Sequence, residues 1–238
     1  MIYHNGHEQD LDAAPHVLGW FLARGWRVIT MTMPQAGENA SPGFRRRKGH
    51  DQLVRLKRPL SFFLQPVVAI LNYSNAETMV GFSGGGWTTV VAAAIDPRIR
   101  YSYSIAGSEP WRWRCRPDKP GCEADLEQRL IPNYLRLYEL GSGRDRRQLA
   151  LYNLHDPCCF GGRTHRIWGP LVRGNFDAVS DPSSHSHAVT ALHLHLITQD
   201  LRRWAVRGAR DAAPAAATTR RQLGRAGRFV RPGSSSPP

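Results

Sequence analysis

The stretch Glu77-Thr-Met-Val-Gly-Phe-Ser-Gly-Gly-Gly-Trp87 decides the fold of this chain. It contains the pattern G-x-S-x-G, as Gly81-Phe82-Ser83-Gly84-Gly85, between an apolar strand-like run and the apolar helix-like run Thr88–Ile95. Where a strand turns sharply into a helix, a serine projects from the apex, and glycines on either side remove Cβ atoms that would collide. Ser83 is therefore a candidate nucleophile on a strand–turn–helix unit.

Glycine-rich turns also cradle phosphates, and spacing separates the two possibilities. A P-loop requires a lysine directly after its last glycine, but Trp87 follows Gly86. The glycines at 81 and 84–86 do not form the G-x-G-x-x-G pattern of a dinucleotide site either. The helix should end near Ile95, because the residue before Pro97 is pushed out of the α region.

Strand-like and helix-like runs alternate along the chain, which predicts an α/β fold with a mostly parallel sheet and helices on both faces. We expect strands at 2–3, 27–33, 77–80, 101–106, 149–153 and 175–179. We expect helices at 13–24, 60–73, 84–95 and 188–204, with Pro66 kinking or dividing the second of them. Two irregular segments, 36–57 and 107–143, are expected to be lids or binding loops.

The net charge of +13 is unevenly distributed over the 238 residues. Residues 201–238 hold nine arginines and one acidic residue, so this short segment carries most of the excess. It also has little apolar content to offset the entropy of ordering. We expect one catalytic domain over 1–204 and a disordered, solvated basic tail over 205–238. The tail lacks interleaved aromatic residues for base stacking, so no specific nucleic-acid partner is expected.

No run approaches the roughly 18 apolar residues of a membrane span, and the first residues lack the pattern of an export signal. We therefore expect no membrane span and, by default, a cytoplasmic location. Of the four cysteines, Cys115 and Cys122 flank a short loop that a disulfide could close, whereas a bridge between the adjacent Cys158 and Cys159 would be strained and unusual.

A serine hydroxyl needs a histidine to accept its proton and a carboxylate to hold that histidine. Asp156 follows the expected strand 149–153, and His185 and His187 follow the strand 175–179, giving the chain order Ser, Asp, His. We favour His187, because it adjoins the last helix and should be held more rigidly than the alternative, His185.

The other candidates in these regions receive structural roles. We favour Asp156 over Asp177 and over Asp181, which is expected to cap a turn. Two further histidines, His193 and His195, lie within the last expected helix and are interpreted as surface or packing residues.

The negative oxygen that forms during acyl transfer needs preorganised N–H donors. The N–H of Gly84 at the start of the helix is one candidate, and the N–H of Gly6 or His7, after the first strand, is the second. An alternative groups four histidines as a metal site: His4, His7, His185 and His187. No carboxylate or cysteine spacing supports it, so neither a metal nor a cofactor is expected.

The element order, the Gly81–Gly85 motif, the His4-Asn-Gly-His7 turn, Asp156 and His187 together resemble the α/β-hydrolase superfamily over about residues 1–204. The resemblance implies Ser83, Asp156 and His187 at the carboxyl edge of the sheet, no cofactor, and acyl-serine chemistry on a small-molecule ester or amide. One departure is that such proteins usually have one or two further strands before the oxyanion turn, whereas here Met1 stands almost on that turn. We therefore expect either a truncated start or a reduced version of the fold with an exposed sheet edge. The leading interpretation is a carboxylic-ester hydrolase. The alternatives are a peptidase of the same fold and a catalytically silent binding protein.

Overall fold

The computed structural model describes residues 1–7, 14–36, 39, 50, 53, 56–110, 113, 131, 133–143, 145–204 and 206. The chain divides into two units, Met1–Thr198 and Gln199–Pro238. The second unit is described only at 199–204 and 206, which are helical. The expected domain limit at residue 204 and the disordered state of the tail therefore stay predictions. The possible Cys115–Cys122 bridge also lies outside the described residues.

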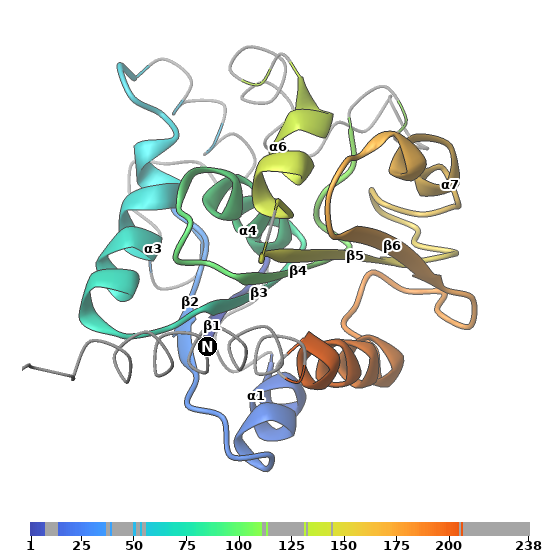
Figure 1. Cartoon of the computed structure of the whole chain (residues 1–238), viewed down its shortest axis with the longest axis horizontal. Helices are drawn as coiled ribbons and strands as arrows, with labels where there is room; N and C mark the ends of the chain where they lie inside the picture. The colour runs from blue at the N-terminus through green and yellow to red at the C-terminus, as the bar shows by residue number, and fades with distance from the viewer. Residues whose placement is uncertain are drawn as a thin grey trace, which may run out of the picture. The chain divides into compact units, whose positions relative to one another are not determined.

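Six parallel strands form one sheet in the order β2-β1-β3-β4-β5-β6 (Figure 1). Their bounds are β1 Ile2–His4, β2 Ile29–Met31, β3 Thr78–Phe82, β4 Tyr101–Ile105, β5 Arg147–Asn153 and β6 Phe176–Asp181. The chain runs from β1 outward to β2 and then returns to the other side of β1 as β3. The strand order therefore reverses between β1 and β3, and in open α/β sheets ligands bind at the carboxyl ends of strands at such a switch point.

Helices cover both faces of the sheet, which confirms the predicted fold class. Helices α3, α4 and α6 lie on one face in Figure 1, and α1 and the helical residues 191–198 lie on the other. The helix bounds are α1 Pro15–Leu22, α3 Ser61–Tyr73, α4 Gly84–Ile95, α6 Tyr134–Gly141 and α7 His165–Trp168, followed by the 3-10 turn η4 Gly169–Leu171. On the second face, Trp20 Nε1 donates to Thr198 Oγ1 at 3.0 Å, which ties α1 to the last helix.

The core lies where α3 and α4 pack on the central strands. All five residues of β3 are buried, as expected of a parallel strand covered on both faces. One core cluster joins these strands to the two helices: Ile2, Val67, Leu71, Met79, Ala92, Ala93 and Ile99. Helix α4 is buried from Gly84 to Ala93, so packing fixes the start of the helix directly after Ser83.

Pro66 neither divides nor ends α3, which runs unbroken from Ser61 to Tyr73. The predicted division of the helix at this residue was therefore wrong, whereas the alternative of a kink stays a prediction. Pro66 lies on the exposed side of the helix, where the carbonyl that loses its N–H partner can be hydrated. The buried side, with Phe63, Val67 and Leu71, supplies the packing that keeps the helix continuous.

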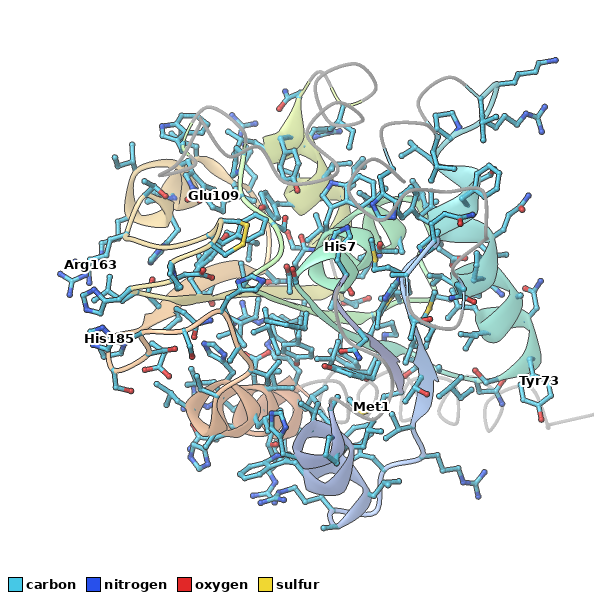
Figure 2. All side chains as sticks on the ribbon, turned by 180° about the vertical axis from the view of Figure 1, so that it is seen from behind. Met1, His7, Tyr73, Glu109, Arg163 and His185 are labelled. Atoms are coloured by element: carbon cyan, nitrogen blue, oxygen red, sulfur yellow. A yellow bond between two sulfur atoms is a disulfide. The ribbon has the colours of Figure 1, made fainter. Side chains whose placement is uncertain are left out.

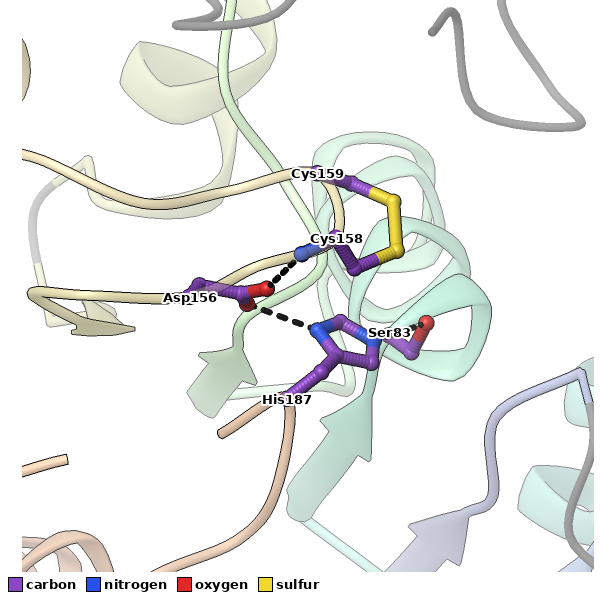
Figure 3. Close-up of a disulfide and its surroundings, with 5 residues drawn as sticks. All are labelled: Ser83, Asp156, Cys158, Cys159 and His187. Carbon is purple, nitrogen blue, oxygen red and sulfur yellow. Dashed lines mark hydrogen bonds and ion pairs between the residues drawn. A yellow bond between two sulfur atoms is a disulfide. The ribbon is translucent and has the colours of Figure 1, made fainter. Parts of the chain in front are cut away.

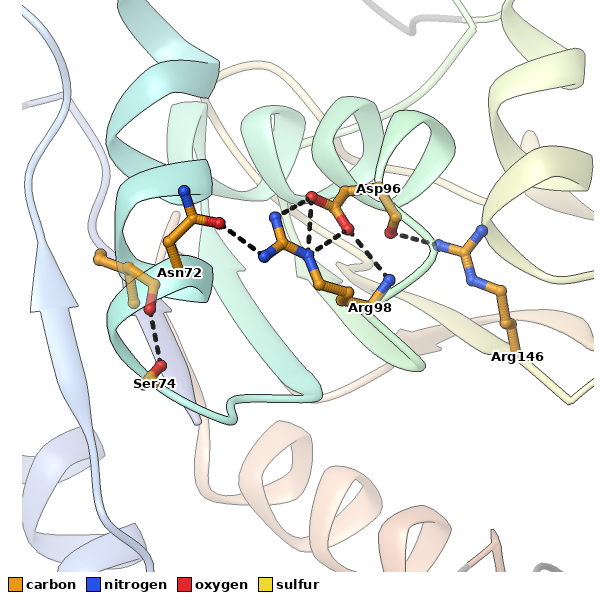
Figure 4. Close-up of polar contacts among 6 residues, drawn as sticks. Asn72, Ser74, Asp96, Arg98 and Arg146 are labelled. Carbon is orange, nitrogen blue, oxygen red and sulfur yellow. Dashed lines mark hydrogen bonds and ion pairs between the residues drawn. The ribbon is translucent and has the colours of Figure 1, made fainter.

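The carboxyl end of α4 is held by two arginines (Figure 4). Arg98 donates to both carboxylate oxygens of Asp96, at 2.7 Å to Oδ2, and to Asn72 Oδ1 of α3 at 2.7 Å. Arg146 donates to the Asp96 carbonyl at 3.1 Å. Cations near a helix carboxyl end complement its dipole and its unpaired carbonyls, so these contacts anchor the helix that begins directly after Ser83.

The last helix begins at a reciprocal cap. The N–H of Thr190 donates to His193 Nδ1, and the N–H of His193 donates to Thr190 Oγ1, each at 3.3 Å. His193 Nε2 donates to the Tyr152 carbonyl at 3.1 Å, so the fully buried ring is neutral in this arrangement. Burial lowers the pKa of His193, against smaller opposing effects of Tyr152 and Asp181. The predicted packing role of His193 is confirmed.

None of the helices in the described part of the chain is both long enough and apolar enough to cross a membrane.

Candidate active site

Ser83 stands at the sharp turn between β3 and α4. Its backbone has φ 53° and ψ −124°, a left-handed conformation that costs a non-glycine residue of order 1–3 kcal/mol. Two backbone hydrogen bonds hold it: Ser83 N donates to the Ile105 carbonyl at 2.9 Å, and Trp87 N donates to the Ser83 carbonyl at 3.1 Å. The strained serine is therefore fixed by the neighbouring strand β4 and by the first turn of α4.

Glycine is required around this turn for steric reasons. A Cβ on Gly81 would collide with the carbonyl of Gly85, and a Cβ on Gly85 would collide with the carbonyl of His4 at the end of β1. A third position, Gly107, was not identified from the sequence, and a Cβ there would collide with the carbonyl of Ser83 itself. The close approach of β1, β3, β4 and α4 at this point excludes any side chain.

His187 bridges Ser83 and Asp156 (Figure 3). Its Nε2 lies 2.9 Å from Ser83 Oγ, and its Nδ1 lies 2.7 Å from Asp156 Oδ2. The Asp156 side chain is 0% exposed and the His187 side chain is 21% exposed. The imidazole of His187 is thus reachable from solvent, whereas the carboxylate that faces it is not.

The partners of the Asp156 carboxylate define the tautomer of His187. Because an ionised carboxylate only accepts hydrogen bonds, Nδ1 carries the proton and Nε2 presents its lone pair to Ser83. The other carboxylate oxygen, Oδ1, accepts the backbone N–H of Cys158 at 2.7 Å, in an Asx-type turn. This contact orients the carboxylate, and the sequence pattern did not indicate it.

Aromatic rings flank the imidazole. The Phe82 ring centroid lies 4.9 Å from that of His187, and the Phe160 ring stacks at 6.5 Å. Both phenylalanines are buried. Their contacts restrict the rotation of His187, so the ring is preorganised toward Ser83 and Asp156.

The alternative residues considered from the sequence lie elsewhere. His185 stacks on His155 with ring centroids 4.3 Å apart, and Figure 2 shows it at the edge of the molecule. Asp177 is exposed on β6 and pairs with Arg147 at 2.7 Å. Asp181 accepts the N–H and hydroxyl of Ser183 at 2.9 and 2.7 Å, so its predicted turn-capping role is confirmed.

The loop after β1 covers Ser83. A Cβ on Gly6 would lie 3.0 Å from the Cβ of Ser83, and a Cβ on Gly84 would collide with the His7 ring. The structure therefore brings together the three residues predicted to stabilise an oxyanion. Gly84 is also the first residue of α4, so its N–H has no acceptor within the helix. Their catalytic roles stay predictions.

His7 is held by a residue that sequence reasoning missed. Its Nε2 lies 3.0 Å from His50 Nδ1, and His50 Nε2 lies 2.7 Å from the Pro34 carbonyl. Since the carbonyl accepts, His50 carries its proton on Nε2, and His7 donates to Nδ1. The His50 ring packs edge-on against Phe63 of α3 at 5.0 Å. His50 lies in an arginine- and glycine-rich stretch with no periodic signal, so only its spatial position identifies it.

The four-histidine metal alternative is not supported by this geometry, because His7 contacts His50 and His185 lies apart from it in Figure 2.

A different group has metal-like spacing in the described part of the chain: the ligand atoms of Asp156, Cys158 and His187 all lie within 4.8 Å of one another. Cys158 is joined to the adjacent Cys159 by a disulfide (Figure 3), the bridge that the sequence analysis considered unusual. The Asx-type turn at Asp156 holds the backbone of the pair.

A cavity of about 760 Å³ lies between α7 and β6, away from Ser83. Its lining includes Arg163, His165 and Asp177, and it includes none of Ser83, Asp156 and His187. Cavity size therefore does not identify this candidate site, which rests on the contacts among those three side chains.

Three solved structures illustrate what the chain resembles. Est1E from Butyrivibrio proteoclasticus is 14% identical, with 87% of this chain and 86% of that chain covered and a TM-score of 0.54. An acetyl xylan esterase from Paenibacillus sp. R4 is 12% identical, with 85% and 73% covered and a TM-score of 0.55. The esterase domain of a Rhodothermus marinus protein is 17% identical, with 87% and 86% covered and a TM-score of 0.51.

No protein-family model and no curated protein sequence matches this chain. The structural likeness and the parallel sheet establish the α/β-hydrolase fold, as the sequence motifs predicted.

Proposed function

We propose that this protein is a serine hydrolase that cleaves a carboxylic ester of a small-molecule substrate through Ser83, His187 and Asp156. The observation that carries the proposal is the continuous hydrogen-bonded chain from Ser83 Oγ through the imidazole to a buried carboxylate. These three hydrogen-bonded side chains lie at the carboxyl edge of the sheet, beside the switch point between β1 and β3. In this reading, the turn at Ser83 is the nucleophile elbow of the fold.

The geometry supports an acyl-transfer sequence in two halves. His187 Nε2 takes the hydroxyl proton as Ser83 Oγ attacks the ester carbonyl carbon, and Asp156 stabilises the imidazolium that forms. The imidazolium then gives this proton to the departing alkoxide, which leaves as an alcohol. In the second half, His187 deprotonates a water that attacks the acyl-serine, and the carboxylic acid departs as Ser83 regains its proton.

The negative oxygen of each tetrahedral intermediate would lie at the amino end of α4. There the Gly84 N–H and the positive end of the helix dipole favour negative charge. The Gly6–His7 loop lies against Ser83 and would supply the second donor. Each such donor contributes about 3 kcal/mol to lowering the barrier.

The preference for an ester over a peptide bond comes from the proteins of similar fold. Est1E has been solved with ferulic acid bound, and two of the similar structures are acetyl xylan esterases. At such low sequence identity, the similarity shows only a shared fold. The chemistry proposed for this protein therefore depends on its own residues.

Fluorophosphonate labelling tests the nucleophile directly, since such reagents phosphonylate an activated serine. We expect one labelled peptide, containing Ser83, and no labelling of Ser83→Ala. The same substitution should lower the turnover of a nitrophenyl ester by about 10⁴ to 10⁶-fold, because the relay acts as a unit. Ser74→Ala, at the exposed end of α3, is the matched control and should retain activity.

Each alternative gives a different outcome. A higher kcat/KM on a peptide anilide than on a nitrophenyl ester would indicate a peptidase. A folded protein that neither labels nor releases nitrophenol would indicate a silent binding protein. Labelling at another serine, with activity retained in Ser83→Ala, would refute the nucleophile assignment.

A further inference from the structure

Three side chains with different metal-binding atoms meet beside Ser83. The carboxylate of Asp156, the sulfur of Cys158 and a ring nitrogen of His187 lie within 4.8 Å of one another. Asp156 and Cys158 come from the loop after β5, and His187 comes from the loop after β6 (Figure 3). The Cys158 N–H to Asp156 Oδ1 hydrogen bond, at 2.7 Å, fixes the first two relative to each other.

This donor set matches the preferences of zinc. Zn²⁺ binds thiolate, imidazole and carboxylate at about 2.0–2.3 Å in a tetrahedral arrangement, which separates its ligand atoms by about 3.4 Å. His187 Nδ1 and Asp156 Oδ2 are 2.7 Å apart, so a small opening would admit an ion between them in place of the shared proton. The half-buried Cys158 and the 21% exposed His187 side chain leave the group reachable from solvent.

The sulfur cannot serve as a ligand in the form that the structure shows, because Cys158 is bonded to Cys159. A cysteine binds a metal ion as its thiolate. A dithiol reductant would transfer two electrons and two protons to the pair, yielding two thiols, and would itself be oxidised to a disulfide. Cys158 would then lose its proton to solvent as it binds the ion.

We propose that reduction of the Cys158–Cys159 disulfide creates an inhibitory zinc site formed by Cys158 Sγ, the Asp156 carboxylate and His187 Nδ1. A neutral imidazole that gives its Nδ1 lone pair to a metal carries its proton on Nε2. Nε2 could then no longer accept the proton of Ser83, so bound zinc would stop the reaction. The inhibition rests on the proposed hydrolase function, whereas the binding of the metal does not.

Two single-sulfur variants separate this site from general metal binding. Cys159→Ser leaves Cys158 without its disulfide partner, and Cys158→Ser leaves Cys159 as the one sulfur of this pair while keeping the backbone N–H that binds Asp156. Co²⁺ titration reports binding independently of activity, because a cobalt–thiolate bond gives a charge-transfer absorption band. We expect this band in Cys159→Ser and not in Cys158→Ser.

Zinc inhibition is then measured relative to the metal-free activity of each variant. Cys159→Ser should be half-inhibited at a zinc concentration lower by about tenfold or more than Cys158→Ser, since loss of a ligand worth about 1.4 kcal/mol has that effect. EDTA should restore its activity. The wild type should become zinc-sensitive after anaerobic reduction by a dithiol and removal of the dithiol, and should lose that sensitivity on reoxidation.

Equal cobalt binding by the two variants would refute the site, and so would a wild type whose zinc sensitivity is independent of its redox state. If a variant fails to fold, the comparison of reduced and oxidised wild type decides the question alone. A cobalt–thiolate band in a protein without esterase activity would support the metal site and contradict the proposed function, so the two failures are distinguishable.

Discussion

Replacing Asp156 by asparagine tests the relay most sharply, because two donors point at this side chain. His187 Nδ1–H and the backbone N–H of Cys158 each donate to one carboxylate oxygen, at 2.7 Å. An amide has one oxygen and one NH2 group, so it can satisfy only one of them. The backbone N–H cannot change, whereas the imidazole can shift its proton. The amide oxygen should therefore face Cys158, and the NH2 group should face the imidazole.

In that orientation Nδ1 must accept, and the proton of His187 moves to Nε2, where it blocks proton transfer from Ser83. We expect turnover to fall by about 10⁴-fold, which corresponds to about 5.5 kcal/mol in the barrier. In the reverse orientation, the amide NH2 group would face the backbone N–H of Cys158, so two donors would oppose each other at a side chain that is 0% exposed. This arrangement costs about 1–3 kcal/mol and therefore does not rescue the enzyme.

The assay is the steady-state kcat and KM on a nitrophenyl ester, with thermal unfolding as the check on folding. Asp177→Asn is the matched control, because the Asp177 side chain is 66% exposed and pairs with Arg147 on β5, not with His187. It should retain nearly full activity. An Asp156→Asn protein that folds and keeps turnover within about tenfold of the parent would show that the carboxylate does not set the tautomer of a catalytic histidine.

Three further outcomes are expected. His187→Ala should reduce ester turnover about as severely as loss of Ser83, while His185→Ala should change it little; equal losses in steady-state assays would contradict this. Burial lowers the pKa of His193, so its stabilising contribution is present above the unfolded value of about 6.5 and is lost as pH falls. The unfolding temperature should therefore drop more between pH 7 and pH 5 in the wild type than in His193→Gln, as differential scanning calorimetry would show. Deletion of residues 207–238 should leave ester turnover intact and reduce salt-sensitive heparin retention, and loss of a cooperative melt would contradict the predicted domain limit.

The parts of the fold that the sequence predicted are those with strong local signals. The buried strand β3 and the helix α4 are marked by apolar runs, and Gly81 and Gly85 mark the turn between them. Chain order then placed Asp156 and His187 after successive strands, and parallel strands deliver such loops to one edge of a sheet. The continuity of α3 through Pro66 was not predictable in this way, because it depends on which side of the helix is packed.

The contacts that the sequence could not supply are made by loops, and some of them join residues distant in the chain. His50 reaches His7 across 43 residues, and no spacing rule connects them. The hydrogen bond from the Cys158 N–H to Asp156 is local in sequence, but an Asx-type turn is only one of several conformations that the segment 156–158 could adopt. Such contacts depend on how the loops close over the sheet, which is determined by tertiary packing.

The position of Ser83 shows how local backbone strain is balanced by tertiary contacts. Its left-handed backbone costs of order 1–3 kcal/mol, and hydrogen bonds to Ile105 and Trp87, each worth about 1 kcal/mol net, offset a comparable amount. The motif reveals Gly81 and Gly85, but the third glycine that makes room for this conformation, Gly107, follows β4 and lies 24 positions along the chain. The nucleophile position is therefore a property of the junction of β3, β4 and α4, and a G-x-S-x-G pattern without a small residue at the end of the neighbouring strand could not adopt it.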